Sequence, residues 1–365
     1  EYWANTLHST VAIEVQASMD PLDCDAGSAL LGAAGPWSVI HDFVNAPQAS
    51  TWYPVALANS LSGSDENDLA PEIDAMFNSA LDNNNNCLSN HNWCYQIGGT
   101  CPVNSTSLYN TVLHELGHGL GFITFVDSSG KRYKDINDQF MQFLQDNNTG
   151  KQWPDMTNGE RAASSRNNAL VWTGANVTDN SSFLTAGKLS GKVKLYSPNP
   201  YASGSSVSHW DTSLTPNELM EPYSTATFLD TLTKMAFRDM GWPSAQPPTI
   251  SNPSPAADAV LVVSSDATAQ RLKVKVSGAE SCTIHYGVFP SISSSVSGTL
   301  SGGYCSSIVS YGAHLTNDGS NVWYVEASNS AGMTTTYPES GTLSFTVSNK
   351  VLLLQPRPWI NSLLL

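Results

Sequence analysis

The sequence is poor in charged residues, and above all in basic ones. Only 13% of its 365 residues are charged, against about a quarter in typical soluble proteins. Sixteen Lys and Arg are outnumbered by thirty-one Asp and Glu, which gives a net charge of −15. An acidic surface repels phosphate backbones, so we expect no nucleic-acid partner. Uncharged polar residues fill the remaining positions, which favours a secreted, extracellular protein.

Long apolar runs are also missing. No run reaches the roughly 18 residues that a membrane-spanning helix needs, so we expect no transmembrane segment. The chain does not open with a basic stretch followed by an apolar one, and we therefore expect any secretion signal to have been removed. With 41% hydrophobic residues, ten Trp and thirteen Tyr, the sequence has enough core-forming residues for a folded, globular protein.

The cysteines indicate disulfide bonds. Their number is even in a chain that otherwise looks extracellular, which favours disulfides over metal thiolates. They form two even groups, Cys24, Cys87, Cys94 and Cys101 before residue 110, and Cys282 and Cys305 after residue 280. Pairing within each group joins Cys282 to Cys305. The first four allow three connectivities, of which we favour Cys94 with Cys101 and Cys24 with Cys87.

A Pro-rich segment at residues 242–248 divides the sequence into two chemically different parts. Such clusters of proline after an amphipathic segment are typical of linkers. Before the segment there are 11 Lys and Arg residues and 25 Asp and Glu residues. After it there are 5 Lys and Arg and 6 Asp and Glu. We expect a catalytic domain over residues 1–245, a second domain over 246–350, and a tail over 351–365 that is too short to span a bilayer.

The second part has the pattern of a small all-β sandwich. Apolar and polar residues alternate over residues 259–263, 272–276 and 322–327, with Gly, Ser and Asn between these runs. The run from Val322 to Gly332 resembles the late strand and turn of immunoglobulin-like or fibronectin-like modules. We expect this module to bind a surface or a large substrate.

The first part mixes strands and helices. The apolar spacing predicts strands over residues 11–15 and 73–78, and helices over residues 107–120 and 228–240. Two polar loops, residues 64–68 and 82–86, offer the oxygen ligands that calcium prefers. Solvated turns are the simpler interpretation of both loops, so calcium is possible but unsupported.

The helix predicted over residues 107–120 contains the residues that indicate a catalytic metal site. Residues 113–122 read Leu-His-Glu-Leu-Gly-His-Gly-Leu-Gly-Phe and contain the pattern H-E-x-x-H. Residues four apart share a helix face, so His114 and His118 can bind one ion. Glu115 then lies beside the metal, where a general base can take a proton from water.

Three glycines follow in the same helix, and they indicate close packing or an abrupt helix end. Gly117, Gly119 and Gly121 each cost up to about 1 kcal/mol in a helix interior. The longer metzincin pattern H-E-x-x-H-x-x-G-x-x-H fits as far as Gly121, but Thr124 stands where the last His belongs. We therefore expect an insertion between about residues 122 and 208.

His209 is the best candidate for the missing ligand. It begins His-Trp-Asp and is followed by Asn-Glu-Leu-Met-Glu-Pro at residues 217–222. The other histidines are more simply interpreted as surface or core residues: His8, His41, His91, His285 and His314.

Together, residues 114–121, His209-Trp210 and Glu218-Leu219-Met220 with Pro222 resemble the leishmanolysin-type metzincin peptidases, over roughly residues 11–242. In that family an insertion separates the helix glycine from the third zinc histidine. The resemblance implies an α+β metzincin-like catalytic domain, with a mixed twisted sheet and an active-site helix.

The resemblance also implies the roles of single residues. His114, His118 and His209 would bind one zinc ion, Glu115 would be catalytic, and Met220 would form the Met-turn beneath the metal. Tyr223 is close enough in sequence to stabilise an oxyanion, although a core or rim position is the simpler interpretation. The expected function is a secreted zinc-dependent endopeptidase that hydrolyses peptide bonds by a zinc-activated water with Glu115 as general base.

Two other functions compete with this one. A non-enzymatic adhesin or carbohydrate-binding protein could keep zinc for structure, but structural zinc usually has four protein ligands and needs no base such as Glu115. We find no convincing fourth ligand in the sequence. The second alternative is a zinc hydrolase that acts on a non-peptide amide or ester.

Overall fold

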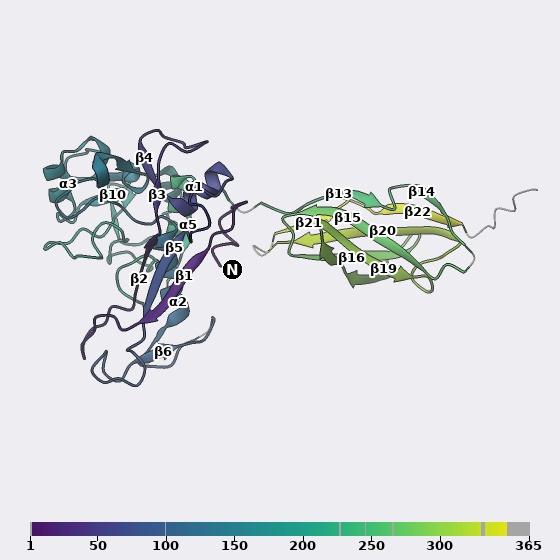
Figure 1. Cartoon of the computed structure of the whole chain (residues 1–365), viewed down its shortest axis with the longest axis horizontal. Helices are drawn as coiled ribbons and strands as arrows, with labels where there is room; N and C mark the ends of the chain where they lie inside the picture. Colours follow the sequence, from purple (N-terminus) through teal and green to yellow (C-terminus); the bar gives the residue numbers. More distant parts are fainter. Residues whose placement is uncertain are drawn as a thin grey trace, which may run out of the picture. The chain divides into compact units, whose positions relative to one another are not determined.

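The computed structural model describes residues 2–98, 100–225, 228–244, 246–264, 266–329 and 333–348. The chain is mostly β-sheet with few helices (Figure 1). It divides into two compact units at about Ser244, within the Pro-rich segment. Residues 351–365, the expected tail, lie outside the described residues, as does most of the turn expected near Gly332. No helix in the described part of the chain is long and apolar enough to cross a membrane.

The first unit contains short strands, α-helices and 3-10 helices. Its strands are β1 (Val15–Asp20), β2 (Gly32–Pro36), β3 (Val39–Ile40), β4 (Thr51–Pro54), β5 (Ile73–Asn78), β6 (Asn92–Cys94), β7 (Ser105–Ser107), β8 (Asn137–Asp138), β9 (Leu144–Asp146), β10 (Leu170–Trp172), β11 (Lys188–Leu189) and β12 (Lys192–Val193). Its helices are α1 (Val55–Ser62), α2 (Leu108–Gly119), α3 (Asn158–Ser164), α4 (Ala175–Asp179) and α5 (Thr231–Met240), with 3-10 turns at Tyr133–Asp135, Phe140–Phe143 and Trp153–Asp155.

A mixed three-stranded sheet supports helix α2. The strand order is β1-β5-β2, with β1 parallel and β2 antiparallel to β5. The central strand β5 spans the residues that the sequence predicted, and its alternate residues Ile73, Ala75 and Phe77 are buried. Helix α2 packs on β2 and β5. The sheet therefore fixes the helix that carries His114 and His118.

Two predicted elements differ at their boundaries. The strand predicted over residues 11–15 begins only at Val15, because its partner β5 begins at Ile73 after Pro71, which has no N–H to continue the ladder. The helix predicted over residues 228–240 begins at Thr231. Leu229 instead pairs with the segment at Glu218, where main-chain bonds join it to Asn217 and Leu219.

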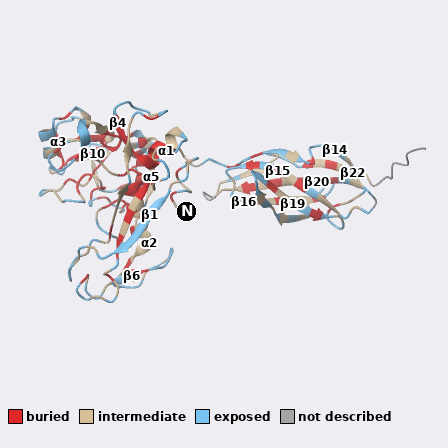
Figure 2. Ribbon diagram, viewed as in Figure 1, coloured by how far each residue is buried: buried red, intermediate tan, exposed pale blue. Residues whose placement is uncertain are grey.

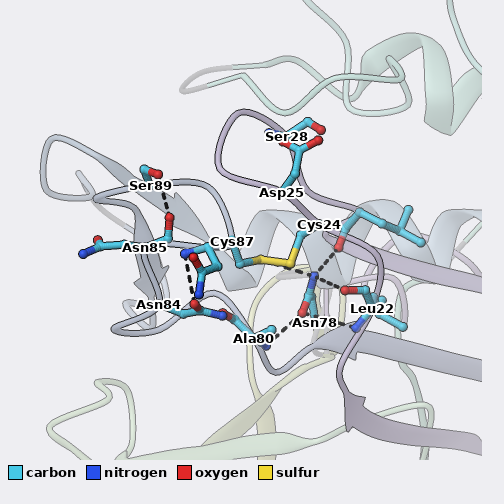
Figure 3. Close-up of a disulfide and its surroundings, with 12 residues drawn as sticks. Leu22, Cys24, Asp25, Ser28, Asn78, Ala80, Asn84, Asn85, Cys87 and Ser89 are labelled. Atoms are coloured by element: carbon cyan, nitrogen blue, oxygen red, sulfur yellow. Dashed lines mark hydrogen bonds between the residues drawn. A yellow bond between two sulfur atoms is a disulfide. The ribbon is translucent and has the colours of Figure 1, made fainter.

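Two disulfides hold a lobe at the end of this sheet. Cys24 bonds Cys87 and Cys94 bonds Cys101, as the sequence analysis favoured. Figure 3 shows the Cys24–Cys87 disulfide next to Asn78, the last residue of β5. The fully buried Asn78 amide donates to the carbonyls of Leu22 and Leu30 and accepts from the Ala80 N–H. One side chain thus joins the loops on both sides of the disulfide.

The segment between α2 and His209, where we expected an insertion, is part of the core of this unit. Phe122, Trp172 and Trp210 lie in one aromatic cluster, with the rings of Phe122 and Trp210 centred 5.0 Å apart. Arg161 is 1% exposed and donates to the carbonyls of Gly130, Trp153 and Met156. The segment therefore has internal structure that returns the chain to helix α2.

The second unit is a sandwich of two sheets. Its strands are β13 (Thr249–Ser254), β14 (Ala259–Val262), β15 (Ala269–Ser277), β16 (Ser281–Val288), β17 (Ser294–Ser297), β18 (Thr299–Ser301), β19 (Tyr304–Ser310), β20 (Gly319–Ser328), β21 (Thr334–Tyr337) and β22 (Leu343–Ser348). One sheet has the order β13-β15-β19-β18, and the other has the order β14-β22-β20-β16-β17 with β21 also paired to β20.

The core of the sandwich lies between these sheets. Buried and exposed residues alternate along the strands (Figure 2), and the inward side chains include Leu272, Ile284 and Trp323. The disulfide between Cys282 and Cys305 joins β16 of one sheet to β19 of the other. The predicted sandwich and the predicted third disulfide are both confirmed.

Candidate metal centre and cleft

Helix α2 begins with a side-chain cap and ends with a glycine turn. The Ser107 hydroxyl accepts from the Asn110 N–H at 3.2 Å, which satisfies one of the free N–H groups of the first turn. The helix ends at Gly119, and Gly121 follows with a φ of +120°, which other residues rarely adopt. The chain can therefore turn sharply away just after His118.

The other two helix glycines allow close packing, as the sequence indicated. A Cβ at Gly119 would lie 2.3 Å from Ile73 Cγ2, so a side chain there would push α2 away from β5. A Cβ at Gly117 would lie 2.6 Å from the sulfur of Met220. Met220 is fully buried and therefore lies against the helix between His114 and His118.

The three predicted ligands come together. The Nε2 atoms of His114 and His209 lie 3.1 Å apart, and Nε2 of His118 lies 3.2 Å from each of them. In the described part of the chain, these residues form the group that could hold a metal ion. His209 reaches the helix although ninety residues separate it from His118 in the sequence.

The hydrogen bonds of the Nδ1 atoms determine which nitrogen of each histidine can bind a metal ion. Each Nδ1 lies 2.8 Å from a main-chain carbonyl oxygen, and the acceptors are Leu219 for His114, Phe122 for His118 and Ser205 for His209. A carbonyl only accepts, so each Nδ1 carries the hydrogen and each neutral ring presents an Nε2 lone pair.

Three lone pairs that face one another need a cation between them. Burial lowers the pKa of all three imidazoles, and it lowers the pKa of His118 to about 3 together with the nearby His114. The rings are therefore neutral near pH 7, and no proton is available to bridge the Nε2 atoms. A metal ion is the group that this donor set fits.

Glu115 lies beside this cluster and is held by the edge of the sheet. The side chain is 7% exposed and accepts a hydrogen bond from the main chain of Ala34 in β2. Gly32 leaves room for it, because a Cβ there would lie 3.0 Å from Glu115 Cγ. Burial raises the pKa of Glu115 to about 7. The carboxyl is not one of the metal-binding group, as the sequence analysis expected.

These groups open into a cleft with a volume of about 790 Å³. Its walls come from residues 29–34 around β2, from residues 201–209, and from residues 218–225, and its charged lining residues include no Lys or Arg. Tyr223 is 61% exposed at the rim, and its hydroxyl lies 3.2 Å from that of Tyr196. This bond raises the pKa of Tyr196 to about 12.

Other positions that the sequence analysis discussed are occupied by ordinary contacts. His41 bonds Asp42, His91 bonds Thr106, His285 bonds Glu326 and His314 bonds Ser293. In the polar loops, Asp65 accepts from Asn67 and Leu69, and Asp82 accepts from Trp93 and Tyr95. The bonds of Asp65 are those of a local turn, whereas Asp82 bonds residues 11 and 13 positions away. Within the described residues, neither loop forms a group of three His, Cys, Asp or Glu ligands.

Sequence reasoning missed the parts of the site that main-chain groups supply. The carbonyls of Leu219, Phe122 and Ser205 orient the histidines, but every residue has a carbonyl, so the sequence gives no signal for them. It also missed that Asp23 and Ala29, on either side of the Cys24 disulfide, line the cleft. The run Gly32-Ala33-Ala34 could have indicated close approach to the helix.

No family model and no curated protein matches this chain. Among solved structures it is similar to an engineered protein (15% identity, TM-score 0.22, 36% of this chain and 25% of that one). It is also similar to CopC from Methylosinus trichosporium (16% identity, TM-score 0.21, 28% and 93%) and to titin domains Z1Z2 in complex with telethonin (17% identity, TM-score 0.20, 29% and 50%). The chain thus spans a quarter of the engineered protein and half of the titin pair, and TM-scores of this size establish no shared fold.

Proposed function

We propose that this chain is a secreted zinc-dependent endopeptidase of the leishmanolysin-like metzincin type. The observation that carries the proposal is the convergence of His114, His118 and His209, with Glu115 beside them, in the lining of a cleft. The sheet β1-β5-β2 with helix α2 packed on it supports an α+β metzincin-like catalytic domain. Three disulfides fit an extracellular protein.

The distances between the histidine Nε2 atoms support zinc as the metal ion at this site. Zinc binds imidazole nitrogen at about 2.0–2.1 Å in tetrahedral sites, which separates neighbouring ligand nitrogens by about 3.3 Å. The observed Nε2 separations of 3.1 and 3.2 Å are close to that value. Three neutral imidazoles also suit a catalytic site, because structural zinc usually has four protein ligands and this group has three.

Glu115 does the proton transfer in this proposal. Zinc held by the three histidines supplies a Lewis acid that polarises a carbonyl group and makes water easier to deprotonate. Glu115 accepts a proton from the water that attacks the peptide carbonyl and then delivers it to the leaving amine. The bond from Ala34 holds the carboxyl in place from the side of β2.

The position of β2 supports a peptide as the substrate. This strand lies at the edge of the sheet, and residues 31–34 in and before it line the cleft next to Glu115. An edge strand has unpaired main-chain groups, to which an extended peptide can bind as an additional strand. The sandwich would then serve to bind a surface or a large substrate, and its immunoglobulin-like or fibronectin-like character stays a prediction.

The test compares wild-type protein with Glu115→Gln and, as a control, Glu339→Gln at an exposed position of the second unit. We expect Glu115→Gln to keep about one zinc per chain and to hydrolyse a denatured protein pool ~10²–10⁴-fold more slowly than wild type. Glu339→Gln should hydrolyse the pool as fast as wild type, and a chelator should abolish hydrolysis by both of these proteins.

Two outcomes would overturn the proposal. Cleavage of small esters or amides without any cleavage of peptides would favour the hydrolase of non-peptide substrates. Zinc binding without hydrolysis, combined with retention on a glycan matrix, would favour the adhesin.

A further inference from the structure

The chain leaves helix α2 and returns to it at one junction. Thr124 occupies the position where the longer metzincin pattern has its last His, and its N–H donates to the Ser208 hydroxyl at 3.1 Å. Ser208 directly precedes His209, and all three residues line the cleft. A hydrogen bond between residues 84 positions apart thus closes the segment that ends in the third histidine.

A buried carboxylate holds the outgoing side of this junction. Asp138, at the end of β8, is 2% exposed. Its Oδ2 accepts from the Thr124 hydroxyl and the Phe125 N–H, both at 2.8 Å, while Oδ1 accepts from the Met141 N–H at 2.7 Å. Asp138 therefore fixes Thr124, whose N–H in turn holds Ser208.

The returning side has few other bonds to α2. Main-chain bonds join His209 to Tyr196 and Trp210 to Met220, and Nδ1 of His209 bonds Ser205 within its own segment. These partners all belong to the returning chain or to residues after it. Among the described residues, the hydrogen bond between Thr124 and Ser208 ties this segment to the chain leaving the helix that carries His114 and His118, and the rings of Phe122 and Trp210 pack together beside it.

We propose that Thr124, Asp138 and Ser208 are positioning residues that set the place of His209 relative to α2 and so determine how tightly the site binds a divalent metal ion. The inference rests on the metal-binding part of the proposed function. None of the three residues touches the metal-binding Nε2 atoms. They act on His209 indirectly, by holding the main chain at Ser208 in place. Residues that orient metal ligands in this way typically change metal affinity by about 10–100-fold.

The experiment measures metal affinity rather than activity. Full-length wild type, Ser208→Ala, Thr124→Val and Thr124→Ser are stripped of metal and titrated with zinc in competition with a chromophoric chelator. We expect Ser208→Ala and Thr124→Val to bind zinc about 10–100-fold more weakly. Thr124→Ser keeps the hydroxyl that donates to Asp138 and should stay within a few-fold of wild type. Cobalt-loaded Ser208→Ala should also show a changed visible absorption spectrum.

Asp146→Asn is the matched control. Asp146 is 3% exposed and also accepts from two main-chain N–H groups, those of Asn148 and Thr149, and from the Asn167 side chain, and these partners belong to neither side of the junction. We expect it to lower thermal stability without changing zinc affinity.

The outcomes separate this inference from the proposed function. If wild type binds zinc and Ser208→Ala and Thr124→Val bind it equally well, the positioning role is wrong and the zinc site stands. If Asp146→Asn weakens zinc binding as much as they do, the effect is a general loss of stability and the inference is also wrong. If wild type itself binds no zinc, both the inference and the proposed function are wrong.

Discussion

The sulfur of Met220 occupies the space that a side chain at Gly117 would need, because a Cβ there would lie 2.6 Å from Sδ. Gly117 is on α2 between His114 and His118, and Met220 is fully buried. The apolar floor of the site and the helix that carries two of its histidines are therefore fitted to each other through one glycine. Two substitutions at this contact should not act independently.

We expect Gly117→Ala to lower the free energy of unfolding by about 1–3 kcal/mol, because the added methyl group overlaps Met220. Met220→Ala should cost about 2–5 kcal/mol through the cavity that it leaves. The double variant should be more stable than the sum of the two losses predicts, by about 0.5–3 kcal/mol, since the methyl group then enters that cavity. Denaturant unfolding of the four proteins measures this coupling, and strictly additive losses would contradict the contact.

We expect His209→Ala to lose most bound zinc while keeping its fold, because the number of protein ligands falls from three to two. Elemental analysis after dialysis against metal-free buffer measures the zinc content, and circular dichroism checks the fold. His91→Ala is the control, since His91 bonds Thr106 away from the three-histidine group. Full zinc retention in His209→Ala would show that another residue is the third ligand.

Glu160 should titrate at an unusually low pH. Its carboxylate bonds Lys151 and completes the capping box of α3 with Thr157, and these contacts lower the pKa of Glu160 to about 2. A lowered pKa in the folded state stabilises the protein above about pH 4.5, and this contribution is lost as the pH falls towards 2. An NMR titration of the Glu160 carboxyl measures the pKa, and Lys151→Met should raise it. A midpoint near 4.5 in the wild type would show that these contacts do not form in solution.

The two disulfides of the first unit should differ in their contribution to stability. Cys24–Cys87 closes a loop with a sequence separation of 63 residues, and Cys94–Cys101 closes one of 7. Loop-closure entropy predicts losses of about 4 and about 2.5 kcal/mol when each pair is replaced by serine. Urea unfolding of the two double-serine variants tests the order. A larger loss for Cys94 with Cys101 would contradict the entropic explanation.

The sequence predicted those parts of the site that depend on residues close together in the chain. The four-residue spacing of His114 and His118, the glycines after them and the run Ile73–Asn78 each depend on neighbours in one element, and the structure places them as expected. His209 was found through its flanking residues, although a long segment separates it from the helix.

The remaining features depend on contacts that no local pattern encodes. The strand expected over residues 11–15 was displaced by the starting point of its partner, and the helix expected from Phe228 was shortened by the pairing of Leu229 with the segment near Glu218. The junction of Thr124 with Ser208 likewise joins residues that are distant in sequence. Predicting it requires the path of the whole intervening segment.

The three histidines donate to main-chain carbonyls, so substitutions at the acceptor positions leave these hydrogen bonds possible. Replacing Leu219, Phe122 or Ser205 by another residue removes a side chain but leaves the oxygen to which each imidazole donates. Ser205 also lines the cleft, so its side chain could be exchanged for a larger or charged one while the orientation of His209 is kept. The shape of the cleft and the orientation of the three histidines can thus be varied separately, which makes position 205 a natural starting point for redesigning what the cleft accommodates.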